Sequence, residues 1–158
     1  MTTERYEHTQ PGTLMRVTLG LIMGLQFLWL VYLTVRFNPV GFSVACAMLV
    51  VFSVCLLLFH SLTVTVDDET LEIRFGPGLI RKRYPLGELV SCEVVRYSWL
   101  HGCGIHKTWQ GWDYNVSGLD AVEVVLKSGR KDRIGTDAPQ ELAAALKERI
   151  RIGGGRES

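Results

Sequence analysis

Two stretches without a charged side chain lie near the N-terminus: VTLGLIMGLQFLWLVYLTV at residues 17–35 and VGFSVACAMLVVFSVCLLLF at residues 40–59. At about 1.5 Å per residue, a helix formed by either stretch approaches the ~30 Å thickness of a bilayer's hydrocarbon core. A signal peptide would have a shorter apolar segment followed by a small-residue cleavage site. The sequence therefore predicts two transmembrane helices, within a membrane segment that covers residues 14–60.

The connection between the two stretches is short and contains Asn38 and Pro39, which favour a turn. Such a short connection predicts an antiparallel hairpin with both chain ends on one side of the membrane. Arg36 alone lies in the turn, whereas several basic residues flank the outer ends: Arg5, Arg16, Arg74, Arg81, Lys82 and Arg83. By the positive-inside rule, we expect a multi-pass protein of the inner (cytoplasmic) membrane with its soluble domain in the cytoplasm.

Small residues recur at four-residue spacing in both predicted helices. Gly20 and Gly24 form a G-x-x-x-G pair, and Gly41 and Ala45 repeat the spacing in the second helix. This spacing lets helix backbones approach closely in a membrane. We expect Gly20 and Gly24 to pack the hairpin on itself, with a homo-oligomer interface as the alternative. Neither helix contains an ionisable Asp, Glu, Lys or Arg, which argues against an ion pathway.

The chain changes to period-two alternation after residue 61. Leu62, Val64 and Val66 alternate with threonines, and a second alternating run follows an acidic turn, as expected for a hairpin of half-buried strands. Further strands are predicted at residues 79–84, 89–97, 109–116, 120–127 and 130–134. Asp137 and Pro139 then predict the start of a C-terminal amphipathic helix. About seven strands and one helix indicate a curved antiparallel sheet or partial barrel capped by that helix.

Several segments of this region resemble bacterial pleckstrin-homology-like (PH-like) domains. They are VTVDDETLEIRFG at 64–76, RKRYPLGEL at 81–89, AVEVVLKSGR at 121–130 and IGTDAP at 134–139. The resemblance implies a mainly-β PH-like domain over residues 61–151, carried by one or two membrane spans. It also implies a binding or assembly module with no catalytic residues and no cofactor. Residues 1–13 are assigned to an N-terminal tail and 152–158 to a flexible C-terminal tail.

An unusual aromatic stretch supplies the candidate interface residues Trp99, Trp109, Trp112 and Tyr114. Such side chains join an apolar body to a polar tip, so they suit contact with a partner protein or a membrane interface, or packing under a loop. Arg81 and Arg83 share one face of a predicted strand and are the candidates for lipid headgroups. Zinc-ligand residue types also occur, at Cys92, His101, Cys103 and His106.

The formal net charge of +1 excludes the strong basic excess typical of nucleic-acid-binding proteins. No phosphate-binding loop, nucleophile elbow or metalloprotease motif is present in the sequence, so we expect no enzyme. The sequence predicts a membrane-anchored PH-like module that recruits a protein partner. The alternatives are a lipid-headgroup-sensing domain, and a metal-binding sensor or enzyme that uses the His/Cys loop.

Overall fold

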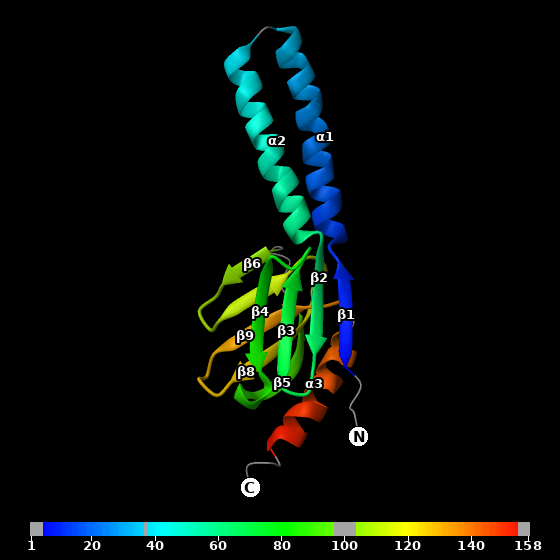
Figure 1. Ribbon diagram of the computed structural model, residues 1–158, viewed down its shortest axis with the longest axis vertical. Helices are drawn as coiled ribbons and strands as arrows, with labels where there is room; N and C mark the ends of the chain where they lie inside the picture. The colour runs from blue at the N-terminus through cyan, green and yellow to red at the C-terminus, as the bar shows by residue number, and fades with distance from the viewer. Residues whose placement is uncertain (1–4, 37, 97–103, 155–158) are drawn as a thin grey trace.

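The computed structural model describes residues 5–36, 38–96 and 104–154. In chain order its elements are β1 (Tyr6–Pro11), α1 (Thr13–Val35), α2 (Pro39–Phe59), β2 (Ser61–Val66), β3 (Thr70–Phe75), β4 (Ile80–Pro85), the short 3₁₀ helix η1 (Leu86–Glu88), β5 (Leu89–Arg96), β6 (Gly104–Lys107), β7 (Trp112–Asn115), β8 (Asp120–Leu126), β9 (Lys131–Gly135) and α3 (Pro139–Gly154). Helices α1 and α2 project together from a mainly-β domain (Figure 1).

Helices α1 and α2 form an antiparallel hairpin, and both are long and apolar enough to cross a membrane. The turn is fixed by Asn38, whose side chain accepts a hydrogen bond of 2.9 Å from the backbone N–H of Gly41. Pro39 follows in the first turn of α2, where its missing N–H costs nothing. The predicted hairpin is therefore present, with its turn where Asn38 and Pro39 indicated.

The close approach of the two helices uses small residues of α2. A Cβ at Gly41 would stand 3.2 Å from the side chain of Leu33, and Ala45 is buried. The amide of Gln26 donates a 3.1 Å hydrogen bond to the carbonyl of Ala45 across the interface. By contrast, a Cβ at Gly20 or Gly24 would meet nothing within 4 Å. The expected packing role of these two glycines within the hairpin is thus corrected, because they lie on the outer face of α1.

The expected N-terminal tail at residues 1–13 is corrected, because Tyr6–Pro11 form strand β1. It pairs antiparallel with β2, in a four-stranded sheet of order β1-β2-β3-β4. Gln10 lies opposite Leu62, and Pro11 lies opposite Ser61. The helical hairpin is therefore an insertion between two neighbouring strands of one sheet (Figure 1). The domain begins before the hairpin, not after it.

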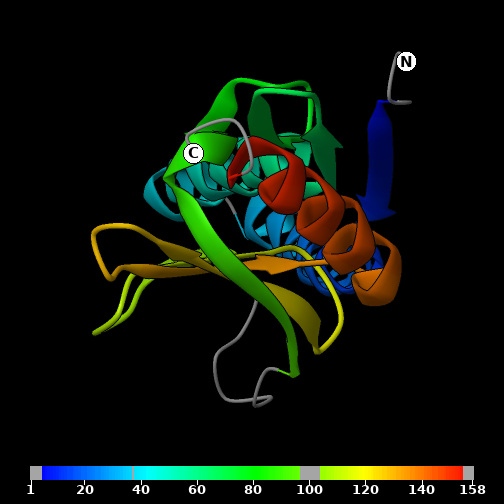
Figure 2. The ribbon, with the colours of Figure 1, turned by 90° about the horizontal axis from the view of Figure 1, so that it is seen from below.

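The second sheet has the order β5-β8-β9-β7-β6, with one parallel pair, β7 and β9. The two sheets enclose one core, and the described strands do not close into a barrel. Helix α3 contacts β5, η1 and β8 and lies across the end of the sheets opposite the hairpin (Figures 1 and 2). It extends to Gly154, so part of the predicted C-terminal tail is helical.

The alternation predicted for the first hairpin is confirmed in β3, whereas in β2 the apolar side chains are buried as predicted but Thr65 between them is buried as well. The residues with less than 3% of their surface exposed include Leu62, Val64, Val66, Leu71, Ile73 and Phe75. Strand β6 lies in a stretch for which the sequence predicts no strand. Its four residues carry only one apolar side chain, Ile105, so they give no period-two signal. Asp137, the expected helix cap, has its carboxylate 2.5 Å from Nε2 of His8 in β1. It thus ties the start of α3 to the first strand.

Candidate partner-binding site

The turn between β6 and β7 forms a braced tip. The backbone N–H of Thr108 donates to the carbonyl of Gly111 at 2.8 Å, and the Thr108 hydroxyl bonds both polar backbone atoms of Gly111. Lys131 of β9 donates its backbone N–H to the carbonyl of Gln110 at 2.8 Å. A Cβ at Gly111 would overlap the carbonyl oxygen of Lys131, so only glycine permits this close approach. The tip is therefore held tightly against β9.

Trp109 stands at this tip with its side chain fully exposed to solvent. Beside it lies a groove of about 260 Å³ lined by Thr108, Trp109, Gln110, Lys131 and Arg133. Hence a large apolar ring, two amide or hydroxyl groups and two cationic side chains face the same space. A fully exposed Trp on a braced turn is the kind of anchor that dominates protein–protein interfaces.

The cations of the groove are positioned by one carboxylate on β8. Glu123 lies 2.9 Å from Nε of Arg133 and 3.4 Å from Nζ of Lys131. Burial alone would raise the pKa of Glu123, but the hydrogen bonds and positive charges of Arg133 and Lys131 outweigh it and hold the pKa below its ordinary value. Glu123 therefore stays ionised and fixes both side chains along the groove.

This depressed pKa predicts an acid-dependent contribution to stability. The charged Glu123 stabilises the fold above its ordinary pKa, and this contribution is lost as the pH falls through the folded-state pKa. We expect Glu123→Gln to lower the thermal midpoint of the full-length protein in detergent at pH 7, with the difference from the parent shrinking toward pH 3. Glu148→Gln, on the exposed face of α3, is the control. A difference that does not vary with pH would show that the charge of Glu123 is not its source.

The predicted aromatic group is divided by the structure. Trp99 lies outside the described residues, and Trp112 is half-buried against the core. Tyr114 is buried in the core, with its ring centroid 6.2 Å from that of Phe75, and burial raises its pKa. Trp112 and Tyr114 are two residues apart on β7, so they share the inward face. Of the described candidates, only Trp109 is fully exposed.

The buried carboxylate of Asp132 supports the turn at residues 108–111 from the domain interior. Asp132 is fully buried and accepts hydrogen bonds from the Tyr84 hydroxyl at 2.6 Å and from the Trp112 backbone N–H at 2.9 Å. A guanidinium nitrogen of Arg130 lies 3.0 Å from the same carboxylate. Burial and the bond to Asp132 raise the pKa of Tyr84, so its phenol stays protonated and donates. Sequence reasoning missed this cluster, because Asp132 sits in a strand otherwise typical of a surface hairpin.

Arg81 and Arg83 do share the outward face of β4, as expected. However, Arg83 pairs with Glu72 of β3 at 3.0 Å, and Nε of Arg81 donates to the carbonyl of Gly78. The predicted headgroup pair is therefore engaged within the sheet and its turn. This arrangement weakens the case for a dedicated anionic-lipid site on β4.

The predicted metal ligands do not converge where they can be placed. His101 and Cys103 lie outside the described residues. Cys92 is on β5 and His106 on β6, the opposite edges of the five-stranded sheet. With strands about 4.8 Å apart, these edges are roughly 19 Å apart. The Cys92 thiol is directed at the carbonyl of Ala143, and burial raises its pKa. Cys92 and His106 therefore cannot share one metal ion in this fold.

His106 lies directly opposite Asp113 in the β6–β7 ladder. Among the residues that the structure describes, no group of three or more His, Cys, Asp or Glu side chains is arranged to hold a metal ion.

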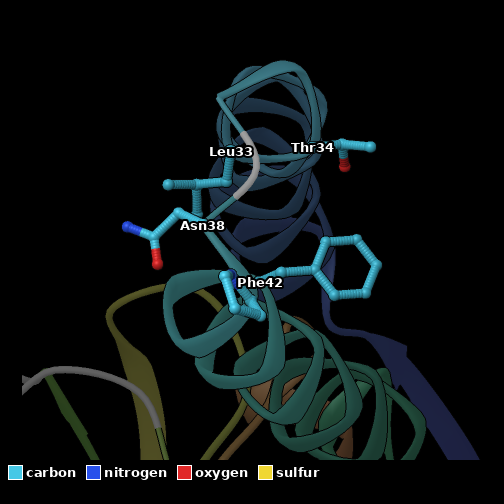
Figure 3. A pocket seen from close by; sticks show the side chains of 5 residues that line it. Leu33, Thr34, Asn38 and Phe42 are labelled. Carbon is cyan, nitrogen blue, oxygen red and sulfur yellow. The ribbon is translucent and has the colours of Figure 1, made fainter.

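A separate hollow of about 380 Å³ lies at the turn of the helical hairpin, lined by Leu33, Thr34, Asn38, Pro39 and Phe42 (Figure 3). It has no charged side chain and offers mainly apolar contacts.

No protein-family model, curated protein or solved structure matched the chain. The function is therefore inferred from the chain's own residues, above all from the apolar hairpin and the Trp109 tip.

Proposed function

We propose that this protein is a membrane-anchored PH-like binding module that recruits a protein partner to a bacterial cytoplasmic membrane. The hairpin crosses the bilayer twice, and the domain faces the cytoplasm. The observation that carries the proposal is the combination of an apolar hairpin that stands clear of the domain with a braced, fully exposed Trp109 on the domain itself.

The exposed surface of the hairpin supports the anchor. In α1 and α2 only Leu33 and Ala45 are buried, while large apolar side chains are exposed along both helices. An apolar surface of this extent is unfavourable in water and favourable in lipid. The hairpin connects neighbouring antiparallel strands, so both of its ends return to the same sheet. Because the hairpin starts and ends at the same domain, the chain must cross the bilayer an even number of times.

The arrangement of the domain supports the PH-like proposal. Two packed sheets enclose one core, and a C-terminal helix covers one end of it. The orientation rests on the basic residues that flank the outer ends of the helices, since Arg16 and Arg5 lie on the domain side and Arg36 alone lies at the turn.

Trp109 supplies the proposed partner contact. An indole ring that is fully exposed on a rigid tip loses little conformational freedom on binding. Lys131 and Arg133 share the single carboxylate of Glu123, so the groove keeps one net positive charge, which favours an acidic partner surface. The membrane anchor raises the local concentration of any membrane-bound partner. Even a weak contact at Trp109 would therefore suffice.

The test is affinity purification of tagged full-length protein from its own membranes in mild detergent, followed by mass spectrometry. We expect a stoichiometric protein that is reduced at least about tenfold by Trp109→Ala, as for a central interface anchor worth more than 1.4 kcal/mol. Val94→Ala, on the exposed part of β5, is the matched control and should retain the partner. Equal recovery with both variants would rule out the Trp109 tip as the contact.

A further inference from the structure

The hairpin joins the domain without a linker. One residue, Gly12, separates β1 from α1, and one residue, His60, separates α2 from β2. The carbonyl of His60 accepts hydrogen bonds from the Gly12 backbone N–H at 2.8 Å and from Nε of Arg16 at 3.1 Å. A Cβ at Gly12 would stand 2.6 Å from the carbonyl oxygen of Phe59, so the backbone at Gly12 and the backbone at Phe59 are in close contact. The junction is therefore short and cross-braced.

Two turns of the domain lie beside this junction. Gly76, with φ +49°, packs against the backbone carbonyls of Leu57 and Leu58 near the end of α2, and its N–H donates to Ser61 at 2.9 Å. The ring of Phe59 meets the edge of Phe75, with centroids 5.6 Å apart. These contacts hold the turn at residues 76–79 level with the end of α2.

The loop at residues 116–119 is held at the same end by β1. The side-chain amide of Gln10 donates a 2.6 Å hydrogen bond to the carbonyl of Ser117, and Gln10 is two residues from Gly12. Each of the two loops carries an exposed leucine: Leu79 is 75% exposed and Leu119 is 37% exposed. Both leucines therefore lie at the end of the domain from which the apolar hairpin emerges.

We propose that residues 76–79 and 116–119 form a membrane-contact surface that rests on the lipid interface of the bilayer crossed by the hairpin. Leu79 inserts among the headgroups and upper acyl chains. The occupant is lipid because this surface continues directly into the apolar surface of the hairpin, with no linker between them. The inference rests on the proposed function only in requiring that the hairpin spans the membrane.

This membrane contact would fix the orientation of the Trp109 tip relative to the bilayer. Gly104 and Asn115 pair at the end of the β6–β7 ladder next to the 116–119 loop, whereas Lys107 and Trp112 pair at the other end. The second pair lies about 10 Å along the strands from the first, and Trp109 lies beyond it. The tip therefore lies at the side of the domain, away from the loops proposed to face the bilayer (Figure 1).

The test uses full-length protein in phosphatidylcholine–phosphatidylglycerol vesicles, with single cysteines carrying the fluorophore nitrobenzoxadiazole. The background lacks the native thiols Cys46, Cys55, Cys92 and Cys103. The labelled variants are Leu79→Cys at the proposed contact, Leu28→Cys in the exposed middle of α1, and Val90→Cys at the far end of the domain. Lipids with a nitroxide near the headgroup or deep in the acyl chain quench the label according to its depth.

We expect the shallow quencher to reduce the Leu79→Cys signal at least twofold more than the Val90→Cys signal, and the deep quencher to reduce the Leu28→Cys signal. Quenching at position 28 without quenching at 79 would overturn the contact surface and leave the anchor standing. An apolar emission maximum at position 79 without quenching would show that protein covers it, which also overturns the proposal. Absence of quenching at position 28 would contradict the spanning hairpin itself.

Discussion

Replacing residues 12–60 with the dipeptide Asn-Gly should give a water-soluble, cooperatively folded domain, whereas a fragment that starts at Ser61 should not fold stably. Pro11 and Ser61 are direct partners in the β1–β2 ladder. Neighbouring antiparallel strands can be joined by a two-residue turn, and Asn-Gly is a favoured sequence for it. The joined chain keeps every strand of the first sheet, while the fragment loses β1.

The loss of β1 is costly because the strand is held at three points along its length. Gln10 bonds Ser117, His8 lies 2.5 Å from Asp137, and Tyr6 packs against the core. Burial, and then the negative charges of Glu141 and Asp137, raise the pKa of Tyr6 to about 12. With ladder hydrogen bonds worth about 1 kcal/mol each, we expect the fragment to be less stable than the joined domain by at least ~3 kcal/mol.

Circular dichroism, gel filtration and urea unfolding of the two chains provide the measurement. The joined domain should be monomeric with a single cooperative transition, and the fragment should aggregate or unfold at much lower urea. Equal stability of the two would mean that β1 is dispensable and that the sheet begins at β2. Failure of both to fold would mean that the domain depends on the hairpin, contrary to our expectation.

Strand β1 could not be predicted from the sequence because its inward side chains are not hydrophobic enough to show a pattern. Tyr6, His8 and Gln10 face inward in alternation with exposed residues, but two of the three are polar. Its partner β2 is also about fifty residues away in the chain, beyond both apolar helices. By contrast, Leu71, Ile73 and Phe75 gave a clear period-two signal, and all three are buried.

The candidate site was predictable in part. Trp109 is exposed, but Tyr114 is a core residue, because the braced turn at residues 108–111 reverses the chain and β7 then alternates inward at Trp112 and Tyr114. The order of strands in the second sheet also depends on tertiary pairing, including the parallel β7–β9 contact. Sequence spacing alone could not show that Cys92 and His106 lie at opposite edges.

Asp132→Ala should be the most damaging single substitution among the charged residues considered. It removes the acceptor of the Tyr84 hydroxyl and the Trp112 backbone N–H, two donors in the interior, and leaves the Arg130 guanidinium without its carboxylate. Breaking a buried pair costs about 3–5 kcal/mol, but the Arg130 side chain is 38% exposed and can regain water. We therefore expect Asp132→Ala to lower the free energy of unfolding by ~3 kcal/mol, near the lower end of that range.

The measurement is urea unfolding of the full-length protein in detergent, with tryptophan fluorescence as the signal. Tyr84→Phe removes one donor and leaves Asp132 with its other partners, so it should cost about 1–2 kcal/mol. Asp120→Ala is the matched control, because its ion pair with Arg96 is exposed and 3.8 Å long, and it should cost less than ~1 kcal/mol. A loss for Asp132→Ala no greater than for Asp120→Ala would show that the buried network adds no stability.

The same substitution connects stability to the proposed partner contact. Asp132 fixes the start of β7 through the Trp112 N–H, and its neighbour Lys131 holds Gln110 of the tip. If Trp109 binds its partner as a pre-organised anchor, loosening this support should weaken partner recovery even under conditions where Asp132→Ala remains folded. Tyr84→Phe, which leaves the Trp112 bond intact, should recover the partner at the parent level. Equal recovery with Asp132→Ala and the parent would show that Trp109 binds without help from the rigidity of its turn.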